Sequence, residues 1–487
     1  MGTRHNNFAP VLRLIAAVLS LSATASAIGV NYGTLGNNLP TPATVAKFLK
    51  TKTIIESVKL FNADPDILRA FAGSGLKVTV TIPNGLIPSL TKDDEARGWI
   101  NDHIAPFYPK TKINRVLVGN EIMATLDDNL ISNLVPAMKA VHRALVKAGI
   151  DDVQVTTAHA MGILKVSEPP SAGQFWPGHD VAVYAPMLQF LRETDAPFMV
   201  NPYSYFGYSP KMANYSLFLP NPGIPDPATG ITYTDMFDAT LDATYSAMKR
   251  LNFTDVPLLV GETGWPTLCL PGQLECTVDN AACYNSHLVA RDINGTGTPL
   301  VPDKPIGIFL FALFNENQKP GPITEQHWGL FKPDMTPVYD CGVVRPGEEI
   351  VASPESSPSS SPKEDQQANG NSGDEQAKGD STDEQAKGDS TDEQGKGNSS
   401  TGSESETSTS NAAGLYPYSQ FVIDFVSATS NYRDNGGLDS TCNLSGGVTT
   451  VTVNPSHAPI VKSREERWMR IWKREAKLMK KLLRSSD

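Results

Sequence analysis

The sequence contains no apolar run as long as the roughly 20 residues that a membrane-spanning helix needs. Its N-terminal apolar stretch covers only residues 14–21, follows two arginines and precedes an Ala-Ser-Ala motif at 25–27. A basic start, a short apolar centre and small residues at the cleavage point are typical of a secretory signal peptide. We therefore predict that residues 1–27 are removed and that the mature chain, starting at Ile28, is secreted.

The chain has fewer basic than acidic residues. Its 41 Lys and Arg and 52 Asp and Glu give a formal net charge of −11. A nucleic-acid partner requires a basic surface that neutralises phosphates, so the composition argues against this class of function, although part of the acidity comes from the linker. A neutral polymer remains compatible with this charge.

Cysteine is scarce, and no cofactor motif is present. The five cysteines are Cys269, Cys276, Cys283, Cys341 and Cys442. An oxidising compartment would pair some of them and leave one over, and the sequence leaves the pairing open. Six residues separate neighbours among the first three cysteines, whereas structural zinc pairs usually have about two to four between them. We therefore expect neither a metal site nor a cofactor.

No glycine-rich phosphate motif follows the first apolar segment, which argues against a doubly wound open sheet, the main alternative fold. Short β-rich runs instead alternate with amphipathic helical stretches, as in β/α units around a parallel sheet. The expected strands cover residues 28–31, 57–61, 77–82, 115–119, 153–157, 198–201, 258–261 and 307–311. Eight strands over this length predict an α/β fold, a (β/α)8 or TIM barrel, for residues 28–345.

Apolar residues are almost missing from residues 346–413, which we predict to be a disordered linker. It carries nine-residue repeats, of which two are close copies and the third is looser. Residues 414–460 regain aromatic and β-branched residues, but so short a segment is marginal for independent folding. Residues 461–487 are basic and amphipathic, and they could contact a membrane surface or a protein or remain a solvated tail.

Two glutamates stand where a barrel enzyme places its catalytic groups, at the C-terminal ends of strands. Glu121 follows the fourth predicted strand and Glu262 follows the seventh. Retaining glycoside hydrolysis uses two carboxyl groups, one as acid and base and one as nucleophile. A Ser/His/Asp triad finds no support, because no Gly-x-Ser-x-Gly motif follows a strand. The residues alone do not decide which glutamate has which role.

Several motifs in residues 28–341 resemble those of plant endo-β-1,3-glucanases of glycoside hydrolase family 17. The matching segments are Gly29-Val30-Asn31-Tyr32-Gly33, Asp64-Pro65-Asp66, Val118-Gly119-Asn120-Glu121, Asn201-Pro202-Tyr203, Glu262-Thr263-Gly264-Trp265-Pro266 and Phe311-Ala312-Leu313-Phe314-Asn315-Glu316-Asn317-Gln318-Lys319. The resemblance implies that Glu121 is the acid/base and Glu262 the nucleophile.

Further residues near the strand ends are candidates for substrate binding. Asn120 is positioned to bond a sugar 2-hydroxyl. Glu316 and Lys319 match an accessory charged pair of the family, for which an ordinary surface ion pair is the alternative. Aromatic side chains that stack on sugar rings, or that pack in the core, are Tyr32, Tyr203, Tyr205, Phe206 and Phe314. His159 follows the fifth predicted strand, and we expect a structural role for it.

Two regions depart from the resemblance. The segment from Cys269 to Cys283 has more cysteines than expected, and residues 414–460 with Cys442 look like the remnant of a cysteine-rich carbohydrate-binding module.

The resemblance and the signal peptide together imply a monomeric enzyme of the apoplast or cell wall that cuts β-1,3-glucan, such as callose or fungal wall glucan, internally. A β-1,3-glucan transglycosylase and a non-catalytic glucan-binding wall protein are the alternatives.

Overall fold

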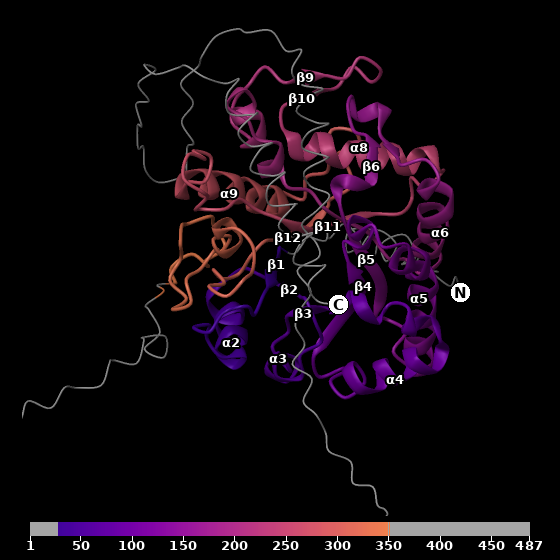
Figure 1. The fold of residues 1–487 in the computed structure, drawn as a ribbon. Coiled ribbons are helices and arrows are strands. Elements are labelled where there is room, and N and C mark those ends of the chain that lie inside the picture. Colours follow the sequence, from indigo (N-terminus) through magenta and orange to yellow (C-terminus); the bar gives the residue numbers. More distant parts are fainter. Residues whose placement is uncertain (1–27, 349, 351–487) are drawn as a thin grey trace, which may run out of the picture. The chain divides into compact units, whose positions relative to one another are not determined.

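The computed structural model describes residues 28–348 and 350, which contain a closed barrel of eight parallel strands (Figure 1). The barrel closes where β12 pairs with β1 in parallel register. In order around the ring, the strands are β1 (Gly29–Tyr32), β2 (Ser57–Leu60), β3 (Lys77–Ile82), β4 (Lys112–Asn120), β5 (Gln154–Ala160), β8 (Phe198–Asn201), β11 (Leu258–Thr263) and β12 (Gly307–Leu310). The predicted TIM barrel is confirmed, and closure rules out the open doubly wound sheet.

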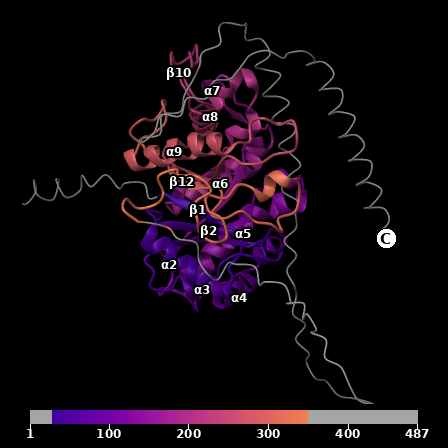
Figure 2. The ribbon, with the colours of Figure 1, turned by 90° about the vertical axis from the view of Figure 1, so that its left-hand side faces the viewer.

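The helices lie outside the ring of strands, as the two views in Figures 1 and 2 show. They are α2 (Pro42–Lys52), α3 (Pro65–Ala70), α4 (Asp93–His103), α5 (Asp128–Lys147), α6 (Ala185–Glu193), α7 (Ala213–Ser216), α8 (Met236–Arg250) and α9 (Val278–Asn294). Two short antiparallel pairs, β6 (Leu164–Val166) with β7 (Gln174–Phe175) and β9 (Ile224–Pro225) with β10 (Thr232–Tyr233), lie in the connections after β5 and β8. No helix in the described part of the chain is both long and apolar enough to cross a membrane.

Local sequence explains where α5, the longest of the described helices, begins and which face it buries. The Asp127 side chain accepts hydrogen bonds from the backbone N–H groups of Asn129 and Leu130, which satisfies donors that the first turn of α5 leaves unpaired. The buried face of this helix carries apolar residues at helical spacing. These are Ile131, Leu134, Val135, Ala137, Met138, Ala140, Val141, Ala144 and Leu145.

The apolar side chains form two layers, one inside the barrel and one between the strands and the helices. The inner cluster takes one side chain from each of five neighbouring strands, namely Leu117, Ala158, Met199, Leu259 and Phe309. Successive strand side chains point to opposite faces, so the neighbours of Leu117 on β4, Val116 and Val118, belong to the outer cluster. The inner cluster is the floor beneath the C-terminal mouth of the barrel.

Several sequence predictions concern residues outside the described part. Residues 1–27, 349 and 351–487 are not described, and they contain the predicted signal peptide, all of the predicted linker except 346–348 and 350, the module remnant and the basic tail.

Candidate active site

Both glutamates singled out by the sequence lie at the C-terminal mouth of the barrel, where enzymes of this fold place their catalytic groups. Glu121 directly follows β4, and Glu262 is the penultimate residue of β11. Both residues are buried, with exposed fractions of 7% and 6%. A carboxyl group this deep depends on its protein neighbours for hydrogen bonds, so these neighbours decide what it can do.

Glu121 is held by the backbone and by a neutral amide donor. The chain turns sharply after β4, with Gly119 at φ 72° and Glu121 at φ 54°, a conformation that is uncommon for a residue with a side chain. The backbone N–H of Glu121 donates to the carbonyl of Ala158 on β5 at 2.9 Å. The amide Nδ2 of Asn201 donates to Oε1 of Glu121 at 2.8 Å.

Glu262 reaches the mouth because β11 is irregular near its end. Leu259 faces the barrel interior and Val260 faces the helices, so strict alternation would turn Glu262 away from the interior. The register between β11 and β12 shifts between Val260 and Thr263, and such a bulge re-aims a side chain. Glu262 consequently contacts groups from β2 and from the segment after β8.

The two oxygens of Glu262 each have a donor, and one donor carries a positive charge. Lys59 Nζ lies 2.7 Å from Oε1, and the Tyr203 hydroxyl donates to Oε2 at 3.0 Å. Charge-assisted hydrogen bonds of this kind stabilise an ionised carboxylate. Glu262 thus has a cationic partner, and Asn201 gives Glu121 a neutral amide donor.

Lys59 is the most informative residue that the sequence did not single out. It lies on β2 and is fully buried, and its ammonium also donates to Oδ1 of Asn31 at 2.9 Å. Asn31 is fixed in turn, because its Nδ2 donates to the carbonyl of Gly261 at 3.0 Å. The sequence offered one signal for Lys59: a lysine lies at an inward position of a predicted buried strand. A buried lysine requires a partner, so a nearby acidic group could have been expected.

Asn201 connects the surroundings of the two glutamates. Its Nδ2 bonds Glu121, and a Cβ at Gly261 would lie 2.8 Å from its Oδ1. Any larger residue at this position would displace the side chain of Met199 or Asn201. The Asn201-Pro202-Tyr203 motif was recognised in the sequence, but only Tyr203 was predicted to act in the site.

Asn120, the predicted partner of a sugar hydroxyl, is anchored by its backbone. Its N–H donates to Oδ1 of Asn84 at 2.8 Å, and Asn84 Nδ2 donates back to its carbonyl at 3.1 Å. The side-chain Oδ1 of Asn120 has no hydrogen-bond partner among the described residues. This oxygen is itself buried, at the end of β4 next to Glu121.

An aromatic cluster borders the Glu262 side of the mouth. Phe311 and Trp328 form its buried part, and the half-buried rings of Tyr203, Tyr205 and Phe206 pack against them. The ring centroids of Tyr203 and Trp328 are 5.3 Å apart in edge-to-face geometry. Of the predicted stacking residues, Tyr203 and Phe206 therefore keep partly accessible rings near the carboxylates.

Three aromatic residues near the site were not predicted from the sequence. Phe311 and Trp328 are core members of the cluster, and Phe61 packs edge-on to Phe311 at 6.2 Å. Phe61 directly follows β2 and is 36% exposed, so part of its ring is open to solvent.

Tyr32 and Phe314 are placed differently from the other predicted stacking residues. Their exposed fractions are only 3% and 2%, and their rings pack edge-to-face at 6.3 Å within the main core. Burial also raises the pKa of the Tyr32 hydroxyl. This placement does not support the sugar-stacking role expected for the two residues, because neither ring has a free face.

Glu316 and Lys319 do not form the direct side-chain pair suggested by the sequence. Lys319 Nζ pairs with Glu325 at 3.1 Å and lies 4.2 Å from the ring of Phe311. Oε1 of Glu316 instead accepts the backbone N–H of Leu35 at 2.7 Å. Burial raises the pKa of the Glu316 carboxyl, while the charge of Lys319 opposes that shift.

His159 has a structural role in the barrel wall. It is fully buried, stacks on Phe198 at 4.9 Å, and places Nε2 3.3 Å from the sulfur of Met187. Burial lowers the pKa of its imidazole to about 3, so the ring is neutral at physiological pH.

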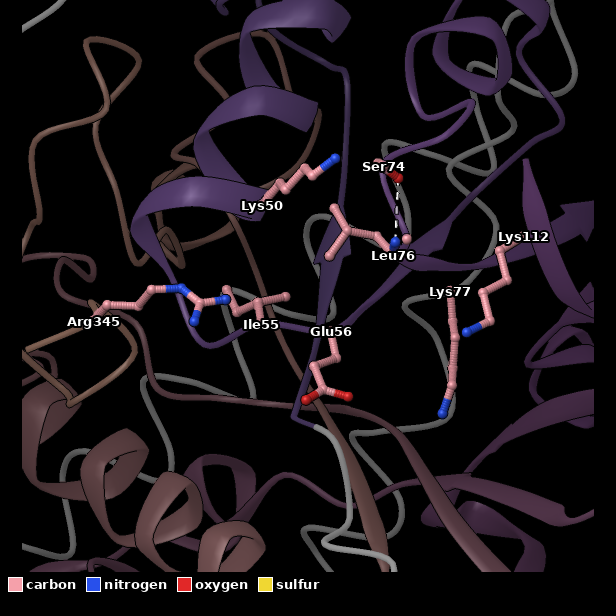
Figure 3. Close-up of a pocket in the computed structure, with 9 residues that line it drawn as sticks. Lys50, Ile55, Glu56, Ser74, Leu76, Lys77, Lys112 and Arg345 are labelled. Atoms are coloured by element: carbon pink, nitrogen blue, oxygen red, sulfur yellow. Dashed lines mark hydrogen bonds between the residues drawn. The ribbon is translucent and has the colours of Figure 1, made fainter. Parts of the chain in front are cut away.

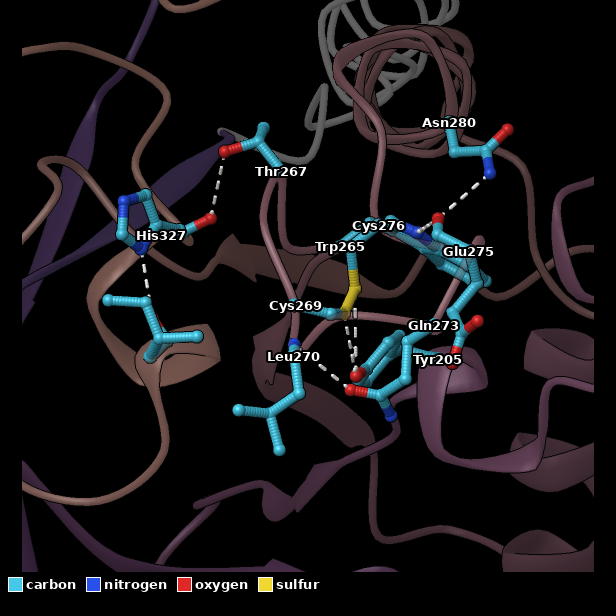
Figure 4. Close-up of a disulfide and its surroundings, with 11 residues drawn as sticks. Tyr205, Trp265, Thr267, Cys269, Leu270, Gln273, Glu275, Cys276, Asn280 and His327 are labelled. Atoms are coloured by element: carbon cyan, nitrogen blue, oxygen red, sulfur yellow. Dashed lines mark hydrogen bonds between the residues drawn. A yellow bond between two sulfur atoms is a disulfide. The ribbon is translucent and has the colours of Figure 1, made fainter. Parts of the chain in front are cut away.

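The cysteine-rich segment after Glu262 contains a disulfide between Cys269 and Cys276, shown in Figure 4. The hydroxyl of Tyr205 donates to Sγ of Cys269 at 3.2 Å, which ties the disulfide loop to the aromatic cluster. Cys341 is buried and carries a free thiol. No group of three or more His, Cys, Asp or Glu side chains within the described range could hold a metal ion.

Comparisons with known proteins identify the family of this chain. The sequence profile of glycosyl hydrolases family 17 matches residues 28–343. A glucan endo-1,3-beta-glucosidase of Triticum aestivum is 49% identical over 339 residues, which cover 68% of this chain and 74% of that protein. Glucan endo-1,3-beta-glucosidase 7 of Arabidopsis thaliana is 43% identical over 65% of this chain and 64% of its own length.

A solved structure of a beta-1,3-glucanase and allergen of Cryptomeria japonica pollen has 41% sequence identity and a TM-score of 0.60. The similarity covers 64% of this chain and 98% of that one. The profile match spans nearly all of the described barrel, including both glutamates at its mouth. The chain therefore belongs to glycosyl hydrolases family 17.

Proposed function

We propose that this protein hydrolyses internal β-1,3-glucosidic bonds of β-1,3-glucans with retention of anomeric configuration. The observation that supports this proposal is the difference between the donors that contact the two glutamates at the mouth. Glu262 is paired with the buried ammonium of Lys59, whereas Asn201 gives Glu121 a neutral hydrogen bond. A retaining enzyme needs an ionised nucleophile and a second carboxyl group that can carry a proton.

In the first step, Glu121 gives its proton to the glycosidic oxygen while an oxygen of Glu262 attacks the anomeric carbon. The bond between that carbon and the leaving oxygen breaks, and a covalent glycosyl-enzyme forms. In the second step, Glu121 takes a proton from water, the water oxygen attacks the anomeric carbon, and the Glu262 carboxylate leaves. Tyr203 and Lys59 hold the Glu262 oxygens in position throughout.

The substrate would lie over the aromatic cluster. The partly exposed rings of Phe61, Tyr203 and Phe206 offer apolar surface to the C–H faces of glucose rings. The half-buried side chain of Asn120, at the end of β4 next to Glu121, is the proposed partner of a sugar hydroxyl. Endo action is proposed because the relatives from Triticum aestivum and Arabidopsis thaliana are named glucan endo-1,3-beta-glucosidases.

We also propose that the protein is a monomer secreted to the apoplast or cell wall. The signal-like residues 1–27 support secretion, and so does the disulfide between Cys269 and Cys276, because disulfides persist in oxidising compartments. N-terminal sequencing of protein from the medium of a secreting plant cell would test this. An N-terminus at Ile28 is expected, and intracellular retention of the uncleaved chain would contradict it.

The decisive experiment compares the mature protein with Glu262→Gln on a linear β-1,3-glucan. The parent should release a ladder of short oligosaccharides whose first-formed reducing ends are the β-anomer by NMR. The variant should lose at least about 10⁴-fold in kcat, because the covalent step has no nucleophile. Glu95→Gln, on the exposed face of α4, is the matched control and should keep full activity.

Three outcomes would contradict the proposal. First-formed α-anomers would exclude retention. Products longer than the substrate would indicate a transglycosylase, in which a sugar instead of water attacks the intermediate. Binding of the polymer without cleavage would indicate a glucan-binding wall protein.

A further inference from the structure

A basic pocket lies at the opposite end of the barrel from the glutamates. It has a volume of about 220 Å³ and is drawn in Figure 3. Four cationic side chains line it, together with one acidic side chain, Glu56; the cations are Lys50, Lys77, Lys112 and Arg345. Lys112 begins β4 and Glu121 directly follows it, so the length of this strand, roughly 25 Å, separates the pocket from the mouth.

The cations of this pocket are held together without an acidic partner of their own. Lys77 and Lys112 are register partners on the neighbouring parallel strands β3 and β4, which brings two like charges side by side. Like charges at directly paired strand positions are destabilising. Neither lysine makes an ion pair with a carboxylate among the described residues, and the same holds for Arg345.

The described chain ends beside this pocket. Backbone hydrogen bonds join Ile54 to Val343 and Arg345 to Lys52, each at 2.9 Å. The side chain of Lys52 then pairs with Glu348 at 2.5 Å. An acidic residue from the end of the domain is thus already bound by a lysine of α2.

The sequence that follows is strongly acidic. Residues 351–413 contain thirteen Asp and Glu against four Lys, a net charge of −9. Its first acidic residue, Glu355, is five residues beyond Ile350 and can therefore reach up to about 17 Å from it. A tether this short keeps the carboxylates at an effective concentration of roughly millimolar at the pocket.

We propose that the basic pocket of Lys50, Lys77, Lys112 and Arg345 binds carboxylates of the acidic segment 351–413 of the same chain. Each exposed ion pair is weak by itself, so several pairs and the tether together hold the segment. The contact anchors the segment at the face away from the catalytic mouth. The proposed contact between the pocket and the segment does not depend on the proposed glucanase activity.

Zero-length carbodiimide crosslinking of the full mature chain, read by mass spectrometry, tests this contact. At about 20 mM salt, Lys50, Lys77 and Lys112 should couple to carboxylates of 351–413 about fivefold more than the exposed reference residues Lys139 and Lys249. At about 500 mM salt the excess should vanish, because the screening length falls to roughly 4 Å.

A double variant separates the pocket from general surface charge. Lys77→Glu with Lys112→Glu should abolish coupling of Lys50 to the segment, while the control pair Lys139→Glu with Lys249→Glu should leave it unchanged. Hydrolytic activity should be equal in both variants, which shows that both are folded. Equal coupling across all exposed lysines would overturn the proposal. Coupling between two molecules, detected by mixing isotope-labelled and unlabelled chains, would also overturn it.

Discussion

Two buried ion pairs occur in different parts of the barrel. Lys59 and Glu262 meet at 2.7 Å at the C-terminal mouth, and Arg291 of α9 meets Asp238 of α8 at 2.7 Å in the surrounding helical layer. Both pairs are nearly inaccessible to solvent. Burial of charge therefore does not by itself distinguish a reactive site from a structural one.

What differs is the set of groups around each pair. Arg291 donates a hydrogen bond to Oδ2 of Asp238, its Nη2 lies 2.7 Å from Oδ1 as an ion pair, and it also donates to the carbonyl of Gly297. Its guanidinium therefore joins two helices and a loop. Lys59 and Glu262 instead converge with Tyr203 at the strand ends, at the barrel mouth that also holds Glu121 and the partly exposed rings. The Arg291 pair is expected to stabilise the fold, and the Lys59 pair is expected to support chemistry.

Removing Arg291, the cation of the ion pair in the helical layer, should have the largest effect on stability. Arg291→Met leaves Asp238 buried without its partner, so we expect the free energy of unfolding to fall by about 3–5 kcal/mol. The kcat of the folded enzyme should change less than twofold. Urea unfolding and activity titrated against folded protein measure the two quantities.

Arg69→Met is the matched control for this prediction. Its exposed pair with Asp66 on α3 should contribute less than about 0.5 kcal/mol. A loss of kcat in Arg291→Met at full folding would remove the distinction between the two pairs.

Removing the cation at the mouth should affect catalysis more than folding. Lys59→Met deprives Glu262 of its charged donor, and we expect kcat to fall about 10²–10³-fold. Lys59→Arg should recover part of the activity, because a cation is restored. Steady-state kinetics on a defined β-1,3-oligosaccharide measures the change, and Lys304→Met on the surface is the control. Unchanged kcat in Lys59→Met would contradict the assigned role.

The neutral donor to Glu262 should contribute less than the cation. Tyr203→Phe removes one hydrogen bond to a carboxylate while leaving the ring in the cluster, so we expect kcat/KM to fall about tenfold. Tyr108→Phe removes an exposed hydroxyl that donates to Asp152, and it should have no effect on kcat/KM. Equal kinetics of Tyr203→Phe and the parent would show that this hydrogen bond is dispensable.

The last effect concerns the pH dependence of stability in the helical layer and leaves activity at neutral pH unchanged. Burial raises the pKa of Asp242 to about 6, while its Oδ2 accepts hydrogen bonds from Tyr233 and Leu300. The folded state therefore binds this proton more tightly than the unfolded state. The resulting stability is fully present below about pH 4 and is lost as pH rises through about 6.

Asp242→Asn keeps an acceptor oxygen for both donors but does not ionise. We expect the decline in unfolding free energy between about pH 4 and 7 to shrink by about 2 kcal/mol in this variant. Thermal unfolding across that range measures it, with the exposed Asp102→Asn as control. Identical pH profiles for Asp242→Asn and the parent would contradict the expectation.

The sequence predicted the fold better than it predicted the interior of the site. All eight barrel strands overlap their predicted ranges, because apolar alternation and turn residues are local signals. Glu121 and Glu262 were found because each follows an apolar strand. Lys59 and Asn201 were not selected as site residues, because nothing local to either indicates which carboxylate it contacts.

The sequence by itself determined the order of strands and helices and the positions of the two glutamates along the chain, since both follow from local periodicity. Only the tertiary structure decided that Lys59 pairs with Glu262, that Asn201 bonds Glu121, and that Tyr32 is packed in the core. Closure of the barrel and the bulge in β11 bring these residues together from positions far apart in the sequence. Such contacts depend on where strands meet in space, which no local pattern of residues encodes.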